Sequence, residues 1–158
     1  HGYYFSPIKN NWGVGLIEGI GESEEFIRTN HVQGPFLNNY DIGGYFIFHL
    51  YPEHRVFVDN RPEAYSVAFF KDIYKPLQAD EKKWREMDGR YGFNSIYFFR
   101  FDATQHAQLF LFRRINDPAW AAVYVDEATI ILLKRNEVNT ELIRRFELPS
   151  EGFRSEIL

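Results

Sequence analysis

The chain alternates between short apolar runs of strand length and longer segments in which apolar residues recur every three or four positions. Three runs, at residues 34–38, 55–60 and 94–101, predict strands, and the third is apolar enough to be buried on both faces. Residues 120–135, "WAAVYVDEATIILLKR", contain two apolar stretches joined at "DE". This pattern predicts an antiparallel hairpin.

The longer segments predict helices, and several carry start signals. Asp41, Asp80 and Thr104 are suited to cap the helices that follow them, and Pro62 is suited to be a first helical residue. The helices are expected over residues 22–30, 42–50, 62–74, 80–92, 104–115 and 139–148.

Strands that alternate with helices indicate an α/β fold. The sequence predicts a mainly parallel sheet flanked by helices, with the antiparallel hairpin at its edge. A length of 158 residues favours one domain that includes the whole chain. Within it, residues 1–21 are expected to be an irregular N-terminal segment and residues 150–158 a loose tail.

Composition and charge argue against several classes of function. Apolar residues make up 45% of the chain, which is typical of a globular domain, and the formal net charge is -4. A mildly acidic chain without a basic stripe argues against a nucleic-acid partner. The absence of cysteine excludes thiol catalysis and disulfides. No apolar run approaches the roughly 18 residues of a spanning helix.

Polar residues gather where the second predicted strand ends. Asp59, Arg61 and Glu63 lie at a strand-to-helix junction, where parallel sheets place ligands. Asp59 could bind a cation or a sugar hydroxyl, and Arg61 a phosphate or carboxylate. The structural alternative is favoured: Asp59 or Asn60 caps the Pro62 helix, and Arg61 pairs with Glu63 or Asp41.

Gly43 and Gly44 pose a similar choice, because glycine in a helix is unfavourable. Close approach of another backbone is the favoured reason, and a ligand at the helix start is the alternative. Three tyrosines near these glycines, Tyr40, Tyr45 and Tyr65, offer aromatic faces of the kind that stack on sugars.

Signatures of metal and cofactor sites are missing. The glycines of residues 13–21 do not follow G-x-G-x-x-G, and the chain has no P-loop, G-x-S-x-G or H-E-x-x-H. His49 and His54 are five apart with Pro52 between them, so ordinary histidines are favoured over metal ligands. We expect neither a metal nor a cofactor.

Read as a unit, "NNYDIGGYFIFHLYPEHRVFVDNRPEAY", residues 38–65, resembles the soluble tail of bacterial multispanning membrane proteins of the glycosyltransferase C class. The shared pattern is an Asn-rich strand end, an aspartate, Gly-Gly-Tyr, an apolar helix, a proline, and then Val-Phe-Val-Asp-Asn-Arg. The likeness extends over most of residues 22–135.

A more distant likeness links the stretch to the catalytic subunit of oligosaccharyltransferase, whose Trp-Trp-Asp-Tyr-Gly motif precedes an apolar helix and a strand ending in Asp-Asn. Residues 39–43 and 59–60 follow the same order. Both tryptophans are replaced, by Asn39 and Tyr40, which argues against recognition of the same acceptor peptide.

The first resemblance implies a non-catalytic, extracytoplasmic domain of a membrane-bound glycosyltransferase-like protein that uses a lipid-linked sugar donor. Its partners would be the membrane-spanning portion of the same chain and a lipid-linked sugar or acceptor. A start at His1 without an initiator methionine or signal peptide fits an excised piece, anchored through upstream segments on the periplasmic or extracellular side. Asp41, Asp59 and Arg61 would then organise the face toward the membrane portion or touch the acceptor.

Two other functions remain open. The domain could be a free-standing soluble enzyme with its site at the Asp59 strand end, which predicts a pocket there and a carboxylate with a shifted pKa. It could also be an interaction module that binds a partner protein and no small ligand.

Overall fold

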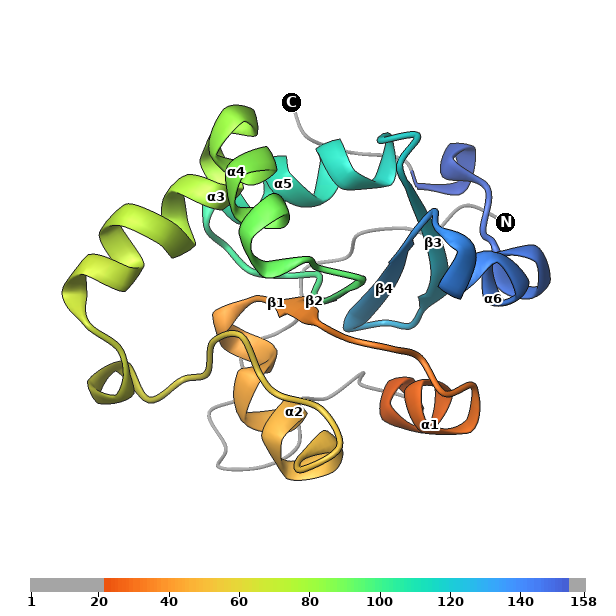
Figure 1. The fold of residues 1–158 in the computed structure, drawn as a ribbon, viewed down its shortest axis with the longest axis horizontal. Helices are drawn as coiled ribbons and strands as arrows, with labels where there is room; N and C mark the ends of the chain where they lie inside the picture. Colours follow the sequence, from red (N-terminus) through yellow and green to blue (C-terminus); the bar gives the residue numbers. More distant parts are fainter. Residues whose placement is uncertain (1–21, 154–158) are drawn as a thin grey trace.

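The computed structural model describes residues 22–153 (Figure 1). The predicted irregular segment at residues 1–21 and the last five residues of the predicted tail lie outside this range. Within the tail, Ser150–Gly152 form the short 3-10 turn η5.

The sheet has four strands: β1 (Phe36–Asn38), β2 (Ser95–Phe99), β3 (Trp120–Val125) and β4 (Thr129–Lys134). Their order is β1-β2-β4-β3, with β1 parallel to β2 and the other two pairs antiparallel. The α/β class and the hairpin are confirmed. The prediction of a mainly parallel sheet is wrong, because the chain forms a mixed sheet with one parallel pair.

The cause of this error is residues 55–60, which form no strand. Their backbone is held by the side chain of Asn38: its Oδ1 accepts from Phe57 N at 2.8 Å, and its Nδ2 donates to Val58 O at 2.6 Å. The buried side-chain amide of Asn38 thus makes hydrogen bonds to this segment in place of the backbone pairing that the expected strand would have formed.

Helices cover both faces of the sheet (Figure 1). On one face, α1 (Ser23–Thr29), α2 (Gly43–Leu50) and α6 (Thr140–Phe146) enclose a core that contains Phe46 and Ile131.

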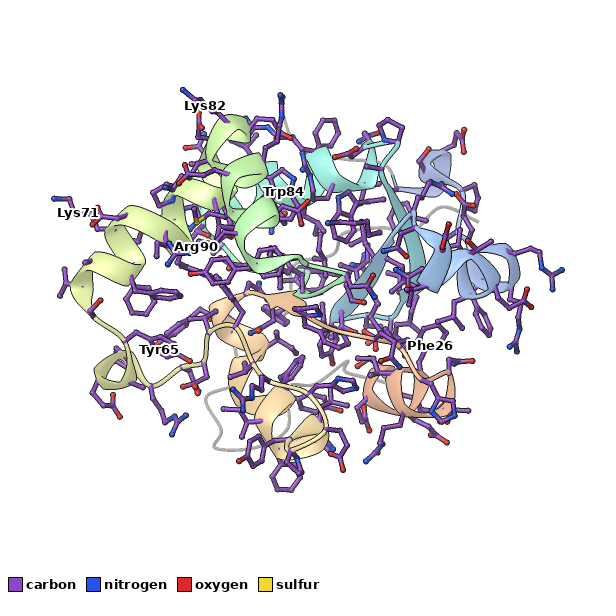
Figure 2. All side chains as sticks on the ribbon, viewed as in Figure 1. Phe26, Tyr65, Lys71, Lys82, Trp84 and Arg90 are labelled. Atoms are coloured by element: carbon purple, nitrogen blue, oxygen red, sulfur yellow. The ribbon has the colours of Figure 1, made fainter. Side chains whose placement is uncertain are left out.

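The other face is covered by α3 (Lys75–Ala79), α4 (Glu81–Tyr91) and α5 (Gln105–Ile115). Trp84 of α4 lies at the centre of this second core, near Phe110 of α5 (Figure 2). β2 is buried on both faces, as its apolar run predicts.

The helix boundaries follow the sequence signals only in part. Asp80 caps α4 as predicted, accepting from Lys83 N at 2.7 Å, and Gly92 ends that helix with a left-handed φ of 62°. Thr104 precedes α5, but its hydroxyl donates to Asp102 instead of capping. The prediction for Asp41 is wrong: it lies in the 3-10 turn η1 (Tyr40–Ile42), and no side chain caps α2.

The expected helix over residues 62–74 is divided. Pro62 begins only the 3-10 turn η2 (Pro62–Ala64). A π-helical segment, η3 (Phe69–Tyr74), then continues into α3. This arm extends from the body of the fold, with Lys71 near its outer end (Figure 2).

Candidate functional site

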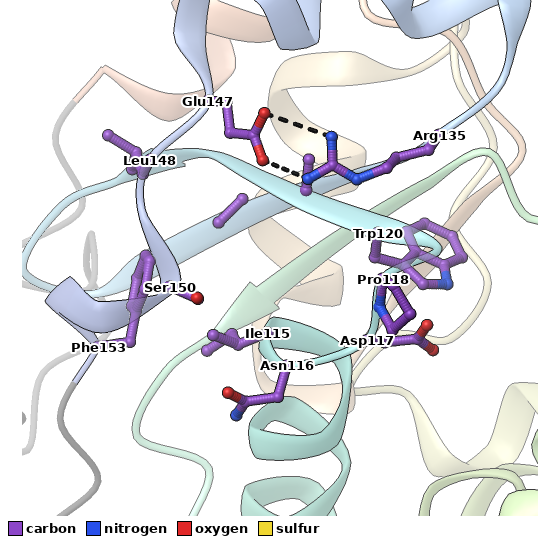
Figure 3. Close-up of a pocket in the computed structure, with 12 residues that line it drawn as sticks. Ile115, Asn116, Asp117, Pro118, Trp120, Arg135, Glu147, Leu148, Ser150 and Phe153 are labelled. Atoms are coloured by element: carbon purple, nitrogen blue, oxygen red, sulfur yellow. Dashed lines mark hydrogen bonds and ion pairs between the residues drawn. The ribbon is translucent and has the colours of Figure 1, made fainter.

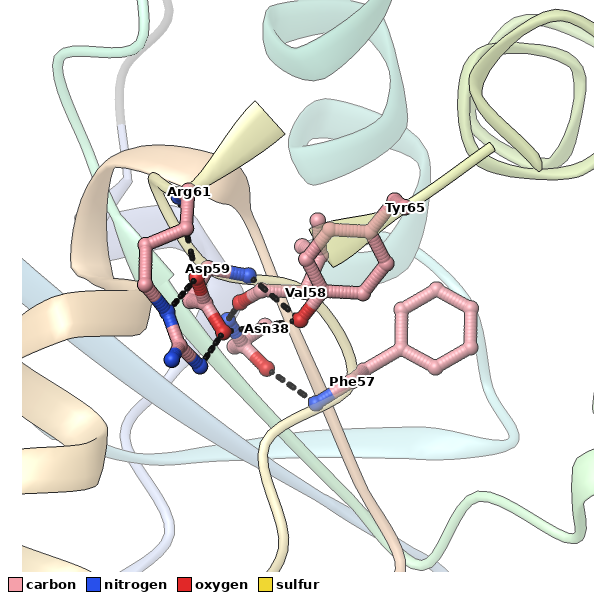
Figure 4. Close-up of polar contacts among 6 residues, drawn as sticks. All are labelled: Asn38, Phe57, Val58, Asp59, Arg61 and Tyr65. Atoms are coloured by element: carbon pink, nitrogen blue, oxygen red, sulfur yellow. Dashed lines mark hydrogen bonds and ion pairs between the residues drawn. The ribbon is translucent and has the colours of Figure 1, made fainter. Parts of the chain in front are cut away.

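Asp59, Arg61 and Tyr65 form one hydrogen-bonded cluster at the loop that follows residues 55–58 (Figure 4). The Asp59 side chain is 1% exposed, and its Oδ1 accepts from both N and Nε of Arg61 at 2.9 Å. Its Oδ2 accepts from Arg61 Nη2 and from the Tyr65 hydroxyl, also at 2.9 Å. The Tyr65 hydroxyl in turn accepts from Asp59 N at 3.1 Å. Both carboxylate oxygens are therefore fully engaged.

The pKa values in this cluster are shifted in the directions expected for a stable ion pair between Asp59 and Arg61. The hydrogen bonds from the Arg61 side chain lower the pKa of Asp59 and outweigh the effect of its burial. Burial, together with the bond to Asp59, raises the pKa of Tyr65 to about 12. Arg61 remains 62% exposed. The cluster thus holds an ionised carboxylate inside and presents a guanidinium outside.

The residues of this junction have other partners than the sequence predicted. Neither Asp59 nor Asn60 caps the turn that begins at Pro62, because Arg61 occupies the cap position without a side-chain bond. Arg61 pairs with Asp59 rather than with Glu63 or Asp41. Glu63 is exposed on η2.

Gly43 and Gly44 pack against the same loop. A Cβ on Gly43 would lie 2.3 Å from Val58 O and 2.4 Å from the Cα of Asp59, and one on Gly44 would lie 3.0 Å from Asn60 Oδ1. Close approach of another backbone, the favoured explanation for Gly43, is confirmed.

A second polar group lies at the carboxyl ends of the parallel strands β1 and β2. Asn39 follows β1, and its amide bonds Phe99 N at 2.9 Å, Phe99 O at 3.0 Å and Asp102 Oδ2 at 3.2 Å. Asp102 Oδ1 accepts from N and Oγ1 of Thr104 at 3.0 and 2.6 Å. These bonds fix the loop that leads into α5.

Tyr40 and Asp41 follow Asn39 in η1, and His106 lies in the first turn of α5. Tyr40 N donates to the Tyr74 hydroxyl at 2.8 Å. Partial burial raises the pKa of Asp41, and the negative charge of Asp102 raises it further. Burial lowers the pKa of His106, although Asp102 opposes this shift. Both groups are thus shifted toward their uncharged forms, near the carboxyl ends of β1 and β2, where parallel strands commonly place ligands.

Tyr45 does not belong to either group. Its hydroxyl donates to Glu24 Oε2 of α1 at 2.6 Å, and its ring lies 4.2 Å from that of His49. His54 contacts the ring of Phe36 at 5.0 Å. Across residues 22–153, no three histidine, aspartate or glutamate side chains are placed to hold a metal ion together.

A cavity of about 180 Å³ lies between the end of α5, the start of β3 and the C-terminal segment (Figure 3). The Arg135 guanidinium and the Glu147 carboxylate form an ion pair at its side. The other lining residues are Ile115, Asn116, Asp117, Pro118, Trp120, Ala121, Ala122, Leu148, Ser150 and Phe153. None of the candidate residues named from the sequence lines it.

No helix within residues 22–153 is long and apolar enough to cross a membrane. Comparison with models of known protein families finds no match. The curated proteins contain no match to the chain, and neither do the solved structures.

Sequence reasoning missed the buried asparagines and Asp102. Asn38 and Asn39 are fully buried, and Asp102 is 5% exposed. The available signal was two consecutive amides directly after an apolar strand, since a buried polar side chain must find partners.

Proposed function

We propose that this domain is a non-catalytic, extracytoplasmic part of a membrane-bound glycosyltransferase-like protein that uses a lipid-linked sugar donor. The domain contributes to acceptor binding or to contact with the membrane-spanning portion, and catalysis takes place elsewhere in that protein. The proposal combines the resemblance of residues 38–65 with the geometry of the Asp59 cluster.

The observation that carries the proposal is the saturation of Asp59. A general base or nucleophile needs an oxygen free to approach a substrate. Oδ1 of Asp59 accepts from Arg61, Oδ2 accepts from Arg61 and Tyr65, and the lowered pKa of this carboxyl makes it a poorer base. This favours anchoring over catalysis.

The exposed guanidinium of Arg61 gives the cluster a binding role. Arginine presents donors in a planar fork that matches phosphate and carboxylate groups. Arg61 Nη1 makes no hydrogen bond to residues 22–153, so it is available to an outside acceptor. A lipid-linked sugar carries phosphate groups of that kind, as the resemblance implies.

The test uses the complete native protein in its own cells. We expect it to sediment with membranes and to remain there after alkaline extraction. In membrane vesicles supplied with lipid-linked sugar donors, Arg61→Glu should lower transfer at least tenfold at an unchanged protein level.

The matched control is Arg90→Glu on α4, which reverses the charge of another exposed arginine and should leave transfer unchanged. The proposal fails if the native protein is released by alkali. It also fails if the isolated 158-residue chain transfers sugar by itself.

One observation favours a second candidate, a free-standing enzyme. Near the carboxyl ends of β1 and β2, burial raises the pKa of Asp41 and lowers that of His106, so both groups are shifted toward their uncharged forms, a protonated carboxyl that suits a general acid and a neutral imidazole that suits a general base. In that case the site lies at Asp41 and His106 rather than at Asp59. Turnover by the isolated chain that is lost in Asp41→Asn would support this candidate.

A further inference from the structure

Strand β3 is the outer strand of the sheet, next to β4. Its first half is covered by the C-terminal segment, because Leu148 N donates to Ala122 O at 2.8 Å. The ladder is irregular between Ala122 and Tyr124, where the register with β4 shifts. Beyond this point, no backbone group of residues 123–125 bonds to any segment of residues 22–153 other than β4. An open strand edge of this kind can pair with another chain.

A groove of about 500 Å³ runs beside this open edge. Its walls come from α1, α6 and the chain after α6, and they are largely apolar. Phe26 of α1 lies 5.1 Å from Tyr124 and 5.1 Å from Phe146, measured between ring centroids. The lining residues are Phe26, Val123, Tyr124, Val125, Arg145, Phe146, Glu147 and Leu148.

The groove carries one available positive charge. Arg145 is exposed, rests over the Phe146 ring at 4.8 Å, and makes no ion pair within residues 22–153. Its neighbour Arg144 is already paired with Glu141 at 2.7 Å. Glu147, the acidic residue of the groove, is engaged by Arg135.

We propose that the open edge of β3 and its groove bind an extended peptide segment of a partner protein as an added strand. The peptide carries apolar side chains at alternate positions, which enter the groove, and an acidic side chain that meets Arg145. Its backbone pairs with residues 123–125. This inference is independent of the proposed glycosyltransferase context.

The chemistry of the surface selects a peptide over other occupants. Strand addition uses backbone donors and acceptors for affinity and pockets beside the edge for specificity, and this site offers both. The unpaired Arg145 supplies the charge complementarity that favours an acidic peptide over a basic one.

The probe is the end-blocked synthetic peptide TVTETVTV, in which the glutamate lies on the same face as the valines, titrated into the isotope-labelled 158-residue chain. We expect shifts of amide resonances centred on residues 123–125. The same peptide with N-methyl groups on the pairing edge should bind at least tenfold more weakly. Arg145→Glu should weaken binding about two- to fivefold, as expected for an exposed ion pair.

Two controls keep the result specific. Arg144→Glu should leave affinity unchanged, and the peptide with lysine in place of glutamate should bind Arg145→Glu better than the unmodified chain. Equal binding of the N-methylated peptide would overturn the proposal, as would shifts confined to another surface. Slow hydrogen exchange, before any peptide is added, at those amides of residues 123–125 that point away from β4 would also overturn it, because the edge would then be occupied by the chain itself or by a second copy.

Discussion

Gly43 and Asp59 are in direct backbone contact: a Cβ added to Gly43 would stand 2.4 Å from the Cα of Asp59. The start of α2 and the loop that carries the Asp59 cluster are therefore held as one unit. Because the contact involves main-chain atoms on both sides, no side-chain rotation can relieve a larger residue. The position of Arg61 thus depends on Gly43 through Asp59.

Gly43→Ala should lower the free energy of unfolding by at least about 2 kcal/mol, because the added methyl group overpacks a rigid contact. The matched control is Gly89→Ala in α4, where a Cβ meets no atom within 4 Å. That change should stabilise the chain by about 0.5–1 kcal/mol through helix propensity. Urea unfolding of both variants measures the contrast, and equal effects would contradict the packing argument.

Asp59→Asn should destabilise the fold by about 2 kcal/mol, because a neutral amide replaces a carboxylate that accepts bonds from a cation. Arg61 should also become more mobile. The control is Glu63→Gln, an exposed neighbour, which should change stability by less than about 0.5 kcal/mol. Unfolding curves and the exchange rate of the Arg61 Nε proton provide the readouts. An unchanged Arg61 exchange rate would mean that Asp59 does not hold the guanidinium.

The contribution of Asp59 should depend on pH in a defined direction. Its folded pKa lies below the ordinary value of 3.8, so the stabilisation is fully present above that value. It is lost as the pH falls through the folded pKa. The difference in unfolding free energy between the unmodified chain and Asp59→Asn should therefore be constant from pH 7 to about 5 and should shrink below pH 4. A difference that grows on acidification would have the wrong sign.

The contribution of Asp41 to stability should depend on pH with the opposite sign. Its folded pKa is raised above 3.8, so its ionised form opposes folding once the pH exceeds the unfolded value. Asp41→Asn should raise the Tm at pH 7, and this gain should disappear below about pH 3.5. Thermal unfolding at pH 7 and pH 3 distinguishes this from an uncharged packing effect, which would persist at both values.

The sequence predicted those parts of the fold that depend on local pattern. The helix that begins after Asp80 and ends at Gly92 was found because both ends carry their own signals. The β3–β4 hairpin was found from two apolar stretches separated by a short polar turn. Sheet topology is a long-range property, and it was misjudged because residues 55–60 have the composition of a strand without a strand partner.

The sequence predicted which residues form the candidate site better than it predicted how they are arranged in space. Asp59, Arg61 and Tyr65 do lie together, six residues or fewer apart along the chain. Tyr45 is close to the same motif in sequence but turns toward Glu24 of α1, because the helix places it on the other side. Asp102 is brought beside Asn39 only by the parallel pairing of β1 and β2, which no local signal records.

The two hydrogen bonds of Asn38 limit which residues this position can accept. Its amide substitutes for a strand by offering one acceptor and one donor at fixed reach: aspartate lacks the donor, glutamine is longer by one carbon, and serine is shorter. Descendants that diverged in ligand, partner or cellular setting would still need asparagine at this position to keep the loop closed. Closure of this loop therefore depends on Asn38 whatever group the exposed Arg61 binds.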